Sequence, residues 1–188
     1  MPALATGLQA LLHRYSLGGK DLAEPGPSTE ELQQIASTAL RAPDHGSLVP
    51  FRFVVVRGAA RARLADLFES YARRAGKDDE SCAIERARAL HVPVTLAVVA
   101  RIDLSHPVVP AHEQWIAVGG AIANTLNALH LLSYAGKMLS GGKVRDQHLV
   151  AAFCQPGETL VGWIVAGTPS RALRANRVKP VAGVLSEF

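Results

Sequence analysis

The sequence predicts an α+β domain built from one sheet and several helices. Short runs rich in β-branched and apolar residues alternate with segments in which apolar residues recur at helical spacing. Apolar residues make up 48% of the 188 residues and charged residues 19%, which is enough to bury a substantial core. Charge, proline or glycine interrupts every long apolar run. The chain is therefore expected to form a single domain over residues 1–188 that does not enter a membrane.

The N-terminal region is predicted to hold two helices joined by a loop. Apolar residues at helical spacing predict the first helix over 3–15, and the Gly- and Pro-rich stretch 16–27 predicts the loop. Ser28 and Glu31 form a capping-box pattern at the start of the second helix. Pro43 ends that helix, because the residue before a proline avoids the helical region. The expected buried stripe of the second helix is Leu32, Ile35, Ala36, Ala39 and Leu40.

The remaining elements are expected in the order strand, two helices, strand, long helix, short helix and strand. The run 93–101 is almost entirely apolar, which is typical of a central strand buried on both faces. The other strands are expected at 51–57 and 159–169. The expected helices are 59–75, 79–90, 113–134 and a short helix that ends near 153, and the connecting segments are a loop at 103–110 and a glycine-rich turn region at 136–146.

The helix expected over 113–134 carries almost no charge and is apolar nearly all round. Its small residues, Gly119, Gly120, Ala121 and Ala123, permit close packing of another helix. Two arrangements bury such a helix: the spine of a monomeric core, or the interface of a homodimer. We favour the homodimer, because it is hard for one subunit of this size to bury the helix on all sides.

Composition argues against several classes of function. The formal charge is +4, but no Lys/Arg run with interleaved aromatics appears, so nucleic-acid binding is not expected. Cys82 and Cys154 lie far apart and the seven histidines show no metal-ligand spacing, so neither a disulfide framework nor a metal site is expected. The N-terminus lacks the basic region and separate apolar block of a secretion signal, which makes a cytoplasmic location the default.

Three segments combine a basic or hydroxyl side chain with a break in secondary structure: 13–16, 41–47 and 136–143. Glycine-rich turns can present backbone N–H groups to an anion, and arginine and serine side chains suit a phosphate. Arg14 and Ser16 are therefore candidates for a phosphate site. The alternatives are that Arg14 only complements the dipole of a helix C-terminus, and that the turn at 41–47 only satisfies local backbone groups.

Taken together and in order, these segments resemble the nitroreductase family of FMN-dependent flavoproteins. The most specific piece is "RAPDHGSLVP" at 41–50. The pieces around it are "LLHRYS" before it and "PVTLAVVA", "VPAHEQ" and "VGWIVAGTP" after it. The similarity covers nearly the whole chain, and it looks closest to the short branch of the family whose members are described as NAD(P)H nitroreductases.

The resemblance implies a homodimer with a nitroreductase-like α+β fold, in which helices surround a central mixed sheet and the long helix is buried at the subunit interface. It implies FMN sites at that interface and electron transfer from NAD(P)H to nitroaromatic or quinone-like acceptors by a ping-pong mechanism. No catalytic side chain is implied, because the flavin carries the hydride. The implied cofactor-binding residues are Arg14, Tyr15, Ser16, Arg41, His45, Ser140, Gly141 and Gly142. Arg41 and His45 are implied to approach from the other subunit. The candidates in the tail for holding the phosphate are Arg171, Arg174 and Arg177.

The chain departs from its relatives at some of these positions. The turn 140–142 reads Ser-Gly-Gly where close relatives carry Trp-Arg-Ser, so a large ring and a charge are missing. Lys143 is a candidate substitute for that arginine. Residues 49–51 and 112–114 differ as well, reading Val-Pro-Phe for Gln-Pro-Trp and His-Glu-Gln for Trp-Glu-Gln. Two other hypotheses therefore stay open: a flavin-binding protein of the same fold that has lost NAD(P)H reductase activity, and a basic interaction protein that uses the fold without flavin.

Overall fold

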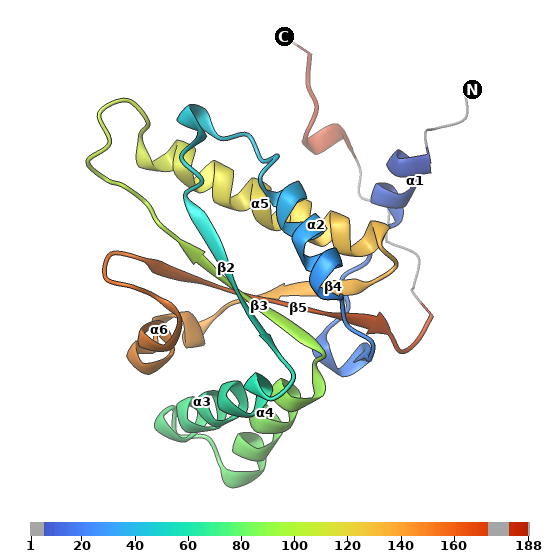
Figure 1. Ribbon diagram of the computed structural model, residues 1–188, viewed down its shortest axis with the longest axis vertical. Coiled ribbons are helices and arrows are strands. Elements are labelled where there is room, and N and C mark those ends of the chain that lie inside the picture. The colour runs from blue at the N-terminus through green and yellow to red at the C-terminus, as the bar shows by residue number, and fades with distance from the viewer. Residues whose placement is uncertain (1–5, 173–180, 188) are drawn as a thin grey trace.

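A computed structural model describes residues 6–172 and 181–187, and an antiparallel sheet with helices on both faces forms the fold in these ranges (Figure 1). The helices are α1 (Thr6–His13), α2 (Thr29–Ala39), α3 (Ala60–Arg74), α4 (Asp79–His91), α5 (Ala111–Leu131) and α6 (Gln147–Phe153). The strands are β1 (Leu22–Ala23), β2 (Phe51–Arg57), β3 (Val94–Ala100), β4 (Ala135–Leu139) and β5 (Thr159–Pro169). Short 3-10 helices are η1 (Gly19–Asp21), η2 (His45–Ser47), η3 (Gly142–Arg145) and η4 (Val181–Gly183). The α+β class predicted from the sequence is confirmed.

The strands form one sheet in the order β1-β5-β3-β2, and β4 also pairs with β5. Every ladder is antiparallel. The expectation of a mixed sheet holds for the described residues only through one isolated parallel bridge, between Ser16 and Gly136. Since β5 pairs with β1, β3 and β4, it holds these three strands together in one sheet.

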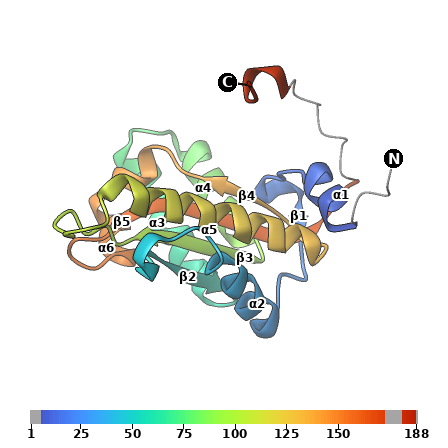
Figure 2. The same ribbon diagram turned by 90° about the horizontal axis from the view of Figure 1, so that it is seen from above.

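The sheet separates two layers of helices, and alternate residues of its central strand face each layer (Figure 1, Figure 2). All seven residues of β3 are buried, as predicted. Leu96 and Val98 pack with Ile35 of α2 and with residues of α5. Ala97 and Val99 belong to a second cluster with residues of α3 and α6. The apolar run that predicted this strand therefore supplies two cores, one on each side.

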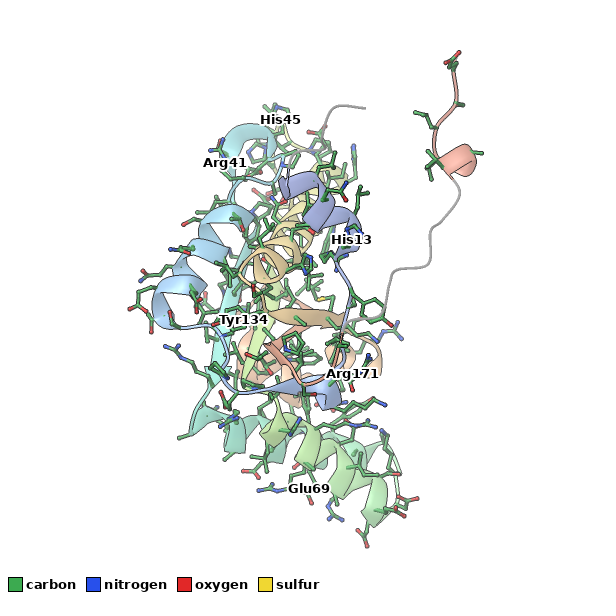
Figure 3. The ribbon with its side chains drawn as sticks, turned by 90° about the vertical axis from the view of Figure 1, so that its right-hand side faces the viewer. His13, Arg41, His45, Glu69, Tyr134 and Arg171 are labelled. Carbon is green, nitrogen blue, oxygen red and sulfur yellow. The ribbon has the colours of Figure 1, made fainter. Side chains whose placement is uncertain are left out.

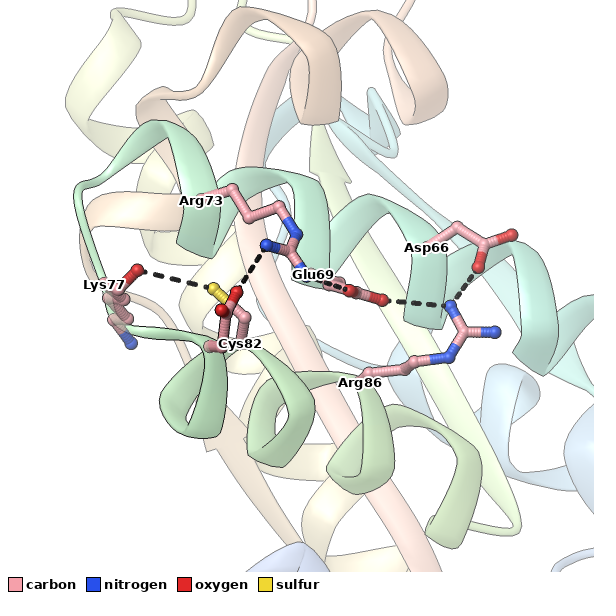
Figure 4. A network of polar contacts seen from close by, with 7 residues as sticks. Asp66, Glu69, Arg73, Lys77, Cys82 and Arg86 are labelled. Carbon is pink, nitrogen blue, oxygen red and sulfur yellow. Dashed lines mark hydrogen bonds and ion pairs between the residues drawn. The ribbon is translucent and has the colours of Figure 1, made fainter.

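On one face of the sheet, α3 and α4 form a helical hairpin. Ala65 and Ala89 are buried between the helices and the sheet. On the outer side, Glu69 binds Arg73 at 3.0 Å and Arg86 at 3.2 Å, and Arg86 also contacts Asp66 (Figure 4). Exposed ion pairs of this kind contribute little to stability. The hairpin is therefore held mainly by its apolar contacts.

The capping box predicted for α2 is present. The Ser28 hydroxyl accepts from the backbone N–H of Glu31 at 3.2 Å, and the Glu31 carboxylate accepts from the backbone N–H of Ser28 at 2.8 Å. Ile35 and Ala39 of the predicted stripe are buried. Leu40 is not, with 56% of it exposed, because it lies at the C-cap, beyond the last full turn.

Two strands lie in segments that the sequence predicts as a loop or a turn. The segment 16–27 contains β1, and the segment 136–146 begins with most of β4. Gly136 suggested a turn, but an added Cβ there would lie 2.7 Å from the carbonyl oxygen of Val165 on β5. The glycine thus permits close approach of two strands. Both strands pair with a partner distant in sequence, which a local pattern does not reveal.

The long helix begins two residues before the predicted 113–134 and ends three residues before its end. Ser133 has a positive φ of 67°, and the N–H of Tyr134 donates to the carbonyl of Leu129 at 2.8 Å. This left-handed ending closes α5 and turns the chain into β4. No helix among the described residues is long and apolar enough to span a membrane.

A partly buried ion pair connects β2 to the segment before β5, and its contribution to stability can be tested. Arg52 donates to both oxygens of Glu158, at 2.8 and 2.5 Å, and to the carbonyl of Phe153 at 2.7 Å. The hydrogen bonds from Arg52 hold the pKa of Glu158 at about 2, well below its usual 4.5. We expect Glu158→Gln to lower the free energy of unfolding by about 2 kcal/mol at pH 7, because charge-assisted bonds are lost.

The pH dependence of this effect has a definite sign. Since the folded protein lowers the pKa of Glu158, the carboxylate stabilises the fold fully above about pH 5, and this contribution is lost as the pH falls from 4.5 to about 2. Urea unfolding at pH 7, 4 and 3 should therefore show the wild type and Glu158→Gln converging at acid pH. Glu24→Gln is the control, because Glu24 pairs with Arg61 at 3.0 Å while 63% of its side chain is exposed. An equal loss in both variants would contradict the prediction.

Candidate functional site

The first predicted segment lies where α1 meets the sheet. α1 ends at His13, and Arg14 Nη1 donates to the hydroxyl of Ser16 at 3.3 Å. Ser16 in turn bridges Gly136 of β4. Backbone pairing therefore fixes the Arg14–Ser16 segment against one strand, with an arginine and a hydroxyl side chain next to each other.

Of the three tail arginines, only Arg171 lies in the described part of the chain, since Arg174 and Arg177 fall outside it. Arg171 donates to the carboxylate of Asp21 at 3.1 Å. That hydrogen bond raises the pKa of Arg171, and Tyr15 adds to the effect. The structure thus brings Arg171 to the same region as the predicted residue Tyr15.

The predicted glycine turn follows β4 and packs against α3. Gly141 has a φ of 106°, a conformation that favours glycine. A Cβ added to Gly142 would lie 2.5 Å from the hydroxyl oxygen of Tyr71. The two glycines thus bring the start of η3 close to α3, and the next residue, Lys143, enters the interior of this region.

A cavity of about 430 Å³ lies between the α3–α4 hairpin, the sheet and these two segments. Its rim includes Gly18 and Gly19, two and three residues after Ser16, and also Ser140 of the glycine turn. The loop that follows Ser16 and the third predicted segment therefore meet at one cavity, and Ser140 is the predicted site residue that lines it. Arg14, Tyr15, Ser16, Gly141 and Gly142 are not among the lining residues. The charged lining residues are Lys20, Glu85, Arg88, Lys137 and Lys143, and the larger apolar ones are Leu64, Phe68, Val92, Leu139, Trp163 and Val165.

The chemistry of this lining suits an anionic molecule with an apolar ring system. The lining contains four cationic side chains and one carboxylate, and its walls are apolar and aromatic. Trp163 is 2% exposed, and its buried indole N–H has no hydrogen-bond acceptor among the described residues.

Sequence reasoning missed Glu85 and Trp163. Glu85 is 7% exposed and accepts hydrogen bonds from Lys143 at 2.6 Å and Lys77 at 3.0 Å. Burial alone would raise the pKa of Glu85, but these bonds outweigh it and lower the pKa. The signal was available: Glu85 shares the buried face of α4 with Cys82 and Ala89, and a carboxylate in an apolar stripe needs partners.

The second predicted segment lies elsewhere in the subunit. His45 Nδ1 lies 2.6 Å from the Glu113 carboxylate, in the first turn of α5, whereas Ser16 lies beside the strand that follows α5. α5 has 21 residues, so its ends are about 30 Å apart. Figure 3 shows Arg41 and His45 at one end of the molecule and Arg171 well away from them. One subunit does not bring all three segments together.

The turn at 41–47 is itself well ordered by local contacts. The Asp44 carboxylate accepts from the backbone N–H of Val49 at 2.8 Å, and Gly46 has a φ of 73°. Arg41 is exposed, and no ion pair joins Arg41 to Asp44 in the part of the chain described. The turn therefore presents Arg41 and His45 outward on a fixed backbone.

The fold and this cavity are typical of a protein that binds a small molecule. A family model described as "Nitroreductase family" matches residues 22–168, which is most of the chain. The chain belongs to the nitroreductase family. It is 34% identical over 163 residues to "Putative NAD(P)H nitroreductase YdjA" of Escherichia coli K12, covering 86% of this chain and 87% of that protein.

Solved structures show the same fold. The nitroreductase-like family protein from Bacillus cereus superposes with a TM-score of 0.82 at 16% identity and covers 100% of this chain and 98% of its own. A nitroreductase with bound FMN from Desulfitobacterium hafniense has a TM-score of 0.70 at 20% identity and covers 98% of this chain and 100% of its own. The nitroreductase-like fold predicted from the sequence is confirmed. The family match begins at Leu22, so it does not include Arg14 or Ser16.

Proposed function

We propose that this protein is an FMN-dependent oxidoreductase that transfers electrons from NAD(P)H to nitroaromatic or quinone-like acceptors by a ping-pong mechanism. The observation that carries the proposal is the cation-lined cavity of about 430 Å³, whose lining includes Gly18 and Gly19 just after Ser16 and Ser140 just before the two glycines of the turn. Membership of the nitroreductase family, the name of the Escherichia coli relative and the FMN-bound structure from Desulfitobacterium hafniense support it.

The residues present fit FMN. Its phosphate needs cationic and hydroxyl donors, which Arg14 and Ser16 supply. Its ring needs an apolar slot with a few polar groups, which the apolar walls and charged side chains of the cavity supply. An added Cβ at Gly141 would meet no atom within 4 Å, so the backbone at this position is open to a ligand. When bound, FMN supplies the two-electron chemistry, so the protein contributes binding, orientation and electrostatics.

A homodimer would complete the site, and exposed apolar surface supports it. Ile116 of α5 is 59% exposed, and an added Cβ at Gly119 would meet nothing, so one face of the uncharged helix has no partner within the described chain. On α1, Leu12 is 60% exposed. Covering this surface with a second copy is the expected solution for such a patch. Sedimentation should then give a dimer mass.

In such a dimer, Arg41 and His45 of the partner subunit would face the flavin of this one. The Glu113 carboxylate lies on Nδ1 of His45, which leaves Nε2 pointing away from Glu113 and available to a ligand. Glu113 would thus orient the ring of His45. Arg41, with its exposed guanidinium, would address a polar edge of the same ligand.

The experiment that tests the proposal is the visible spectrum of the protein after incubation with FMN and desalting, followed by anaerobic NADPH or NADH. Retained yellow flavin that bleaches supports the oxidoreductase and identifies the donor. Retained flavin that stays yellow supports the alternative, a flavin-binding protein that has lost NAD(P)H reductase activity. Loss of all flavin on desalting contradicts both. Parallel double-reciprocal plots with a quinone would support ping-pong kinetics, and intersecting plots would contradict them.

A second prediction concerns the glycine turn. Gly142→Ala is expected to weaken FMN binding about tenfold, because the new methyl group would press on the Tyr71 hydroxyl and displace the turn. Tyr71→Phe removes the hydroxyl, and the next Tyr71 atom, Cζ, would lie at 3.7 Å, an ordinary contact. The double variant should therefore recover most of the affinity in a fluorescence titration with FMN. Equal affinities of the single and double variants would rule out this account.

A further inference from the structure

We propose that Lys143, held in place by Glu85, is the cation that faces the flavin from inside the cavity, strengthens its binding and raises its reduction potential. This inference rests on the proposed function. It is argued from the contacts of Lys143 and not from the family match. The side chain begins directly after the glycine turn and reaches the cavity lining.

The position of the ammonium group is fixed by contacts on several sides. Lys143 Nζ donates to Glu85 Oε2 at 2.6 Å. It lies 4.7 Å from the centroid of the Phe68 ring and 5.8 Å from that of Tyr71. Only 21% of the Lys143 side chain is exposed. Aromatic rings attract a cation over their faces, and burial limits screening by water. The charge is therefore held at one place instead of moving in solvent.

Glu85 alone does not neutralise this charge. Besides Lys143, Glu85 binds Lys77 at 3.0 Å and Arg88 at 3.4 Å, so three cations share one carboxylate. Arg88 and Lys143 line the cavity, and Lys77 does not. The excess positive charge consequently lies on the cavity side of the cluster. An excess of this sign in a partly buried site favours an anionic ligand.

Such a charge distinguishes the two redox states of a flavin. The reduced, anionic form carries more negative charge at the ring than the oxidised form, so a fixed cation stabilises it more and raises the potential. The two glycines of the turn let η3 approach Tyr71, and Lys143 follows them directly. The turn thus delivers Lys143 to the cavity lining.

The test compares Lys143→Met with Lys77→Met in the full-length protein. Both substitutions remove one lysine partner of Glu85, but only Lys143 lines the cavity. We expect Lys143→Met to raise the dissociation constant of oxidised FMN severalfold and that of the reduced form about ten times more. A tenfold difference between the two forms lowers the midpoint potential by about 30 mV. Lys77→Met should change both quantities much less, because Lys77 does not line the cavity.

The measurements are fluorescence titration with FMN and equilibration of the bound flavin with a reference dye under anaerobic conditions. Thermal unfolding of both variants without FMN reports the purely structural cost. If Lys143→Met does not fold, Lys143→Gln, which can still donate to Glu85 but carries no charge, replaces it in the same comparison. Lys143→Arg should retain the potential within a few millivolts of the Lys77→Met control.

The outcomes separate this inference from the proposed function. If the wild type binds FMN and the Lys143 and Lys77 variants have equal affinity and potential, Lys143 is only a structural partner of Glu85 and the inference is wrong. If the wild type itself retains no FMN, the proposed function fails and this inference fails with it. A lowered potential in the Lys143 variant alone supports both.

Discussion

Arg14→Ala is expected to raise the dissociation constant of FMN about 10- to 100-fold. Arg14 directly follows α1 and donates to the hydroxyl of Ser16, and that segment is bridged to β4 through Ser16. A guanidinium that binds a phosphate dianion makes charge-assisted hydrogen bonds worth about 1.5–3 kcal/mol, and the loss of one such contact corresponds to this range in affinity. Fluorescence titration with FMN, at low and at high salt, measures the effect directly.

The comparison with riboflavin makes this prediction specific. Riboflavin lacks the phosphate, so Arg14→Ala should change its affinity little while it weakens FMN. Arg63→Ala is the matched control, because Arg63 is an exposed arginine on α3, away from this segment. Equal weakening of riboflavin and FMN would show that Arg14 supports the fold of the site and does not bind the phosphate.

Gly162→Ala is expected to be the most destabilising small substitution in the sheet, lowering the free energy of unfolding by about 3–5 kcal/mol. Gly162 has a φ of 152° and lies at the register shift between β3 and β5. An added Cβ would lie 2.2 Å from the carbonyl oxygen of Leu139, a backbone atom of β4. Relief therefore requires β4 to move away from β5.

The same movement should also weaken FMN binding, because Leu139 leads directly into the turn 140–142. Urea unfolding and FMN titration of one sample measure both effects. Gly7→Ala serves as the control: Gly7 lies in α1, and an added Cβ there meets no atom within 4 Å. It should be neutral or stabilise by up to about 1 kcal/mol, since alanine favours a helix. Wild-type stability of Gly162→Ala would contradict the packing described here.

Local sequence patterns were sufficient to predict the elements whose formation depends on neighbouring residues and on burial. The capping box at Ser28 and Glu31 and the apolar run of β3 depend on neighbouring residues and on burial, and both were predicted correctly. β4 was missed because its glycine serves close contact with β5, which lies about thirty residues further along the chain. Leu40 was misplaced because apolar spacing says nothing about where the last turn of α2 ends.

The candidate site was only partly accessible from the sequence. The resemblance supplied Arg14, Ser16 and the glycine turn, and the structure places Gly18, Gly19 and Ser140, their neighbours in sequence, around one cavity. Glu85 and Trp163 were not predicted, because their relevance depends on what faces them across the cavity. The roles of all predicted site residues in binding FMN stay predictions, which the variants above test.

The length of α5 has a consequence for mixtures of variants. Since about 30 Å of helix separates His45 from the Arg14 segment, each composite site of a dimer would draw these two groups from different chains. Arg14→Ala and His45→Ala homodimers would then each carry two damaged sites. A heterodimer of the two chains would instead combine both lesions in one site and leave the other site intact. Unfolding and refolding the two weak variants together should therefore restore activity that neither has alone, up to about half of the wild-type activity in each heterodimer.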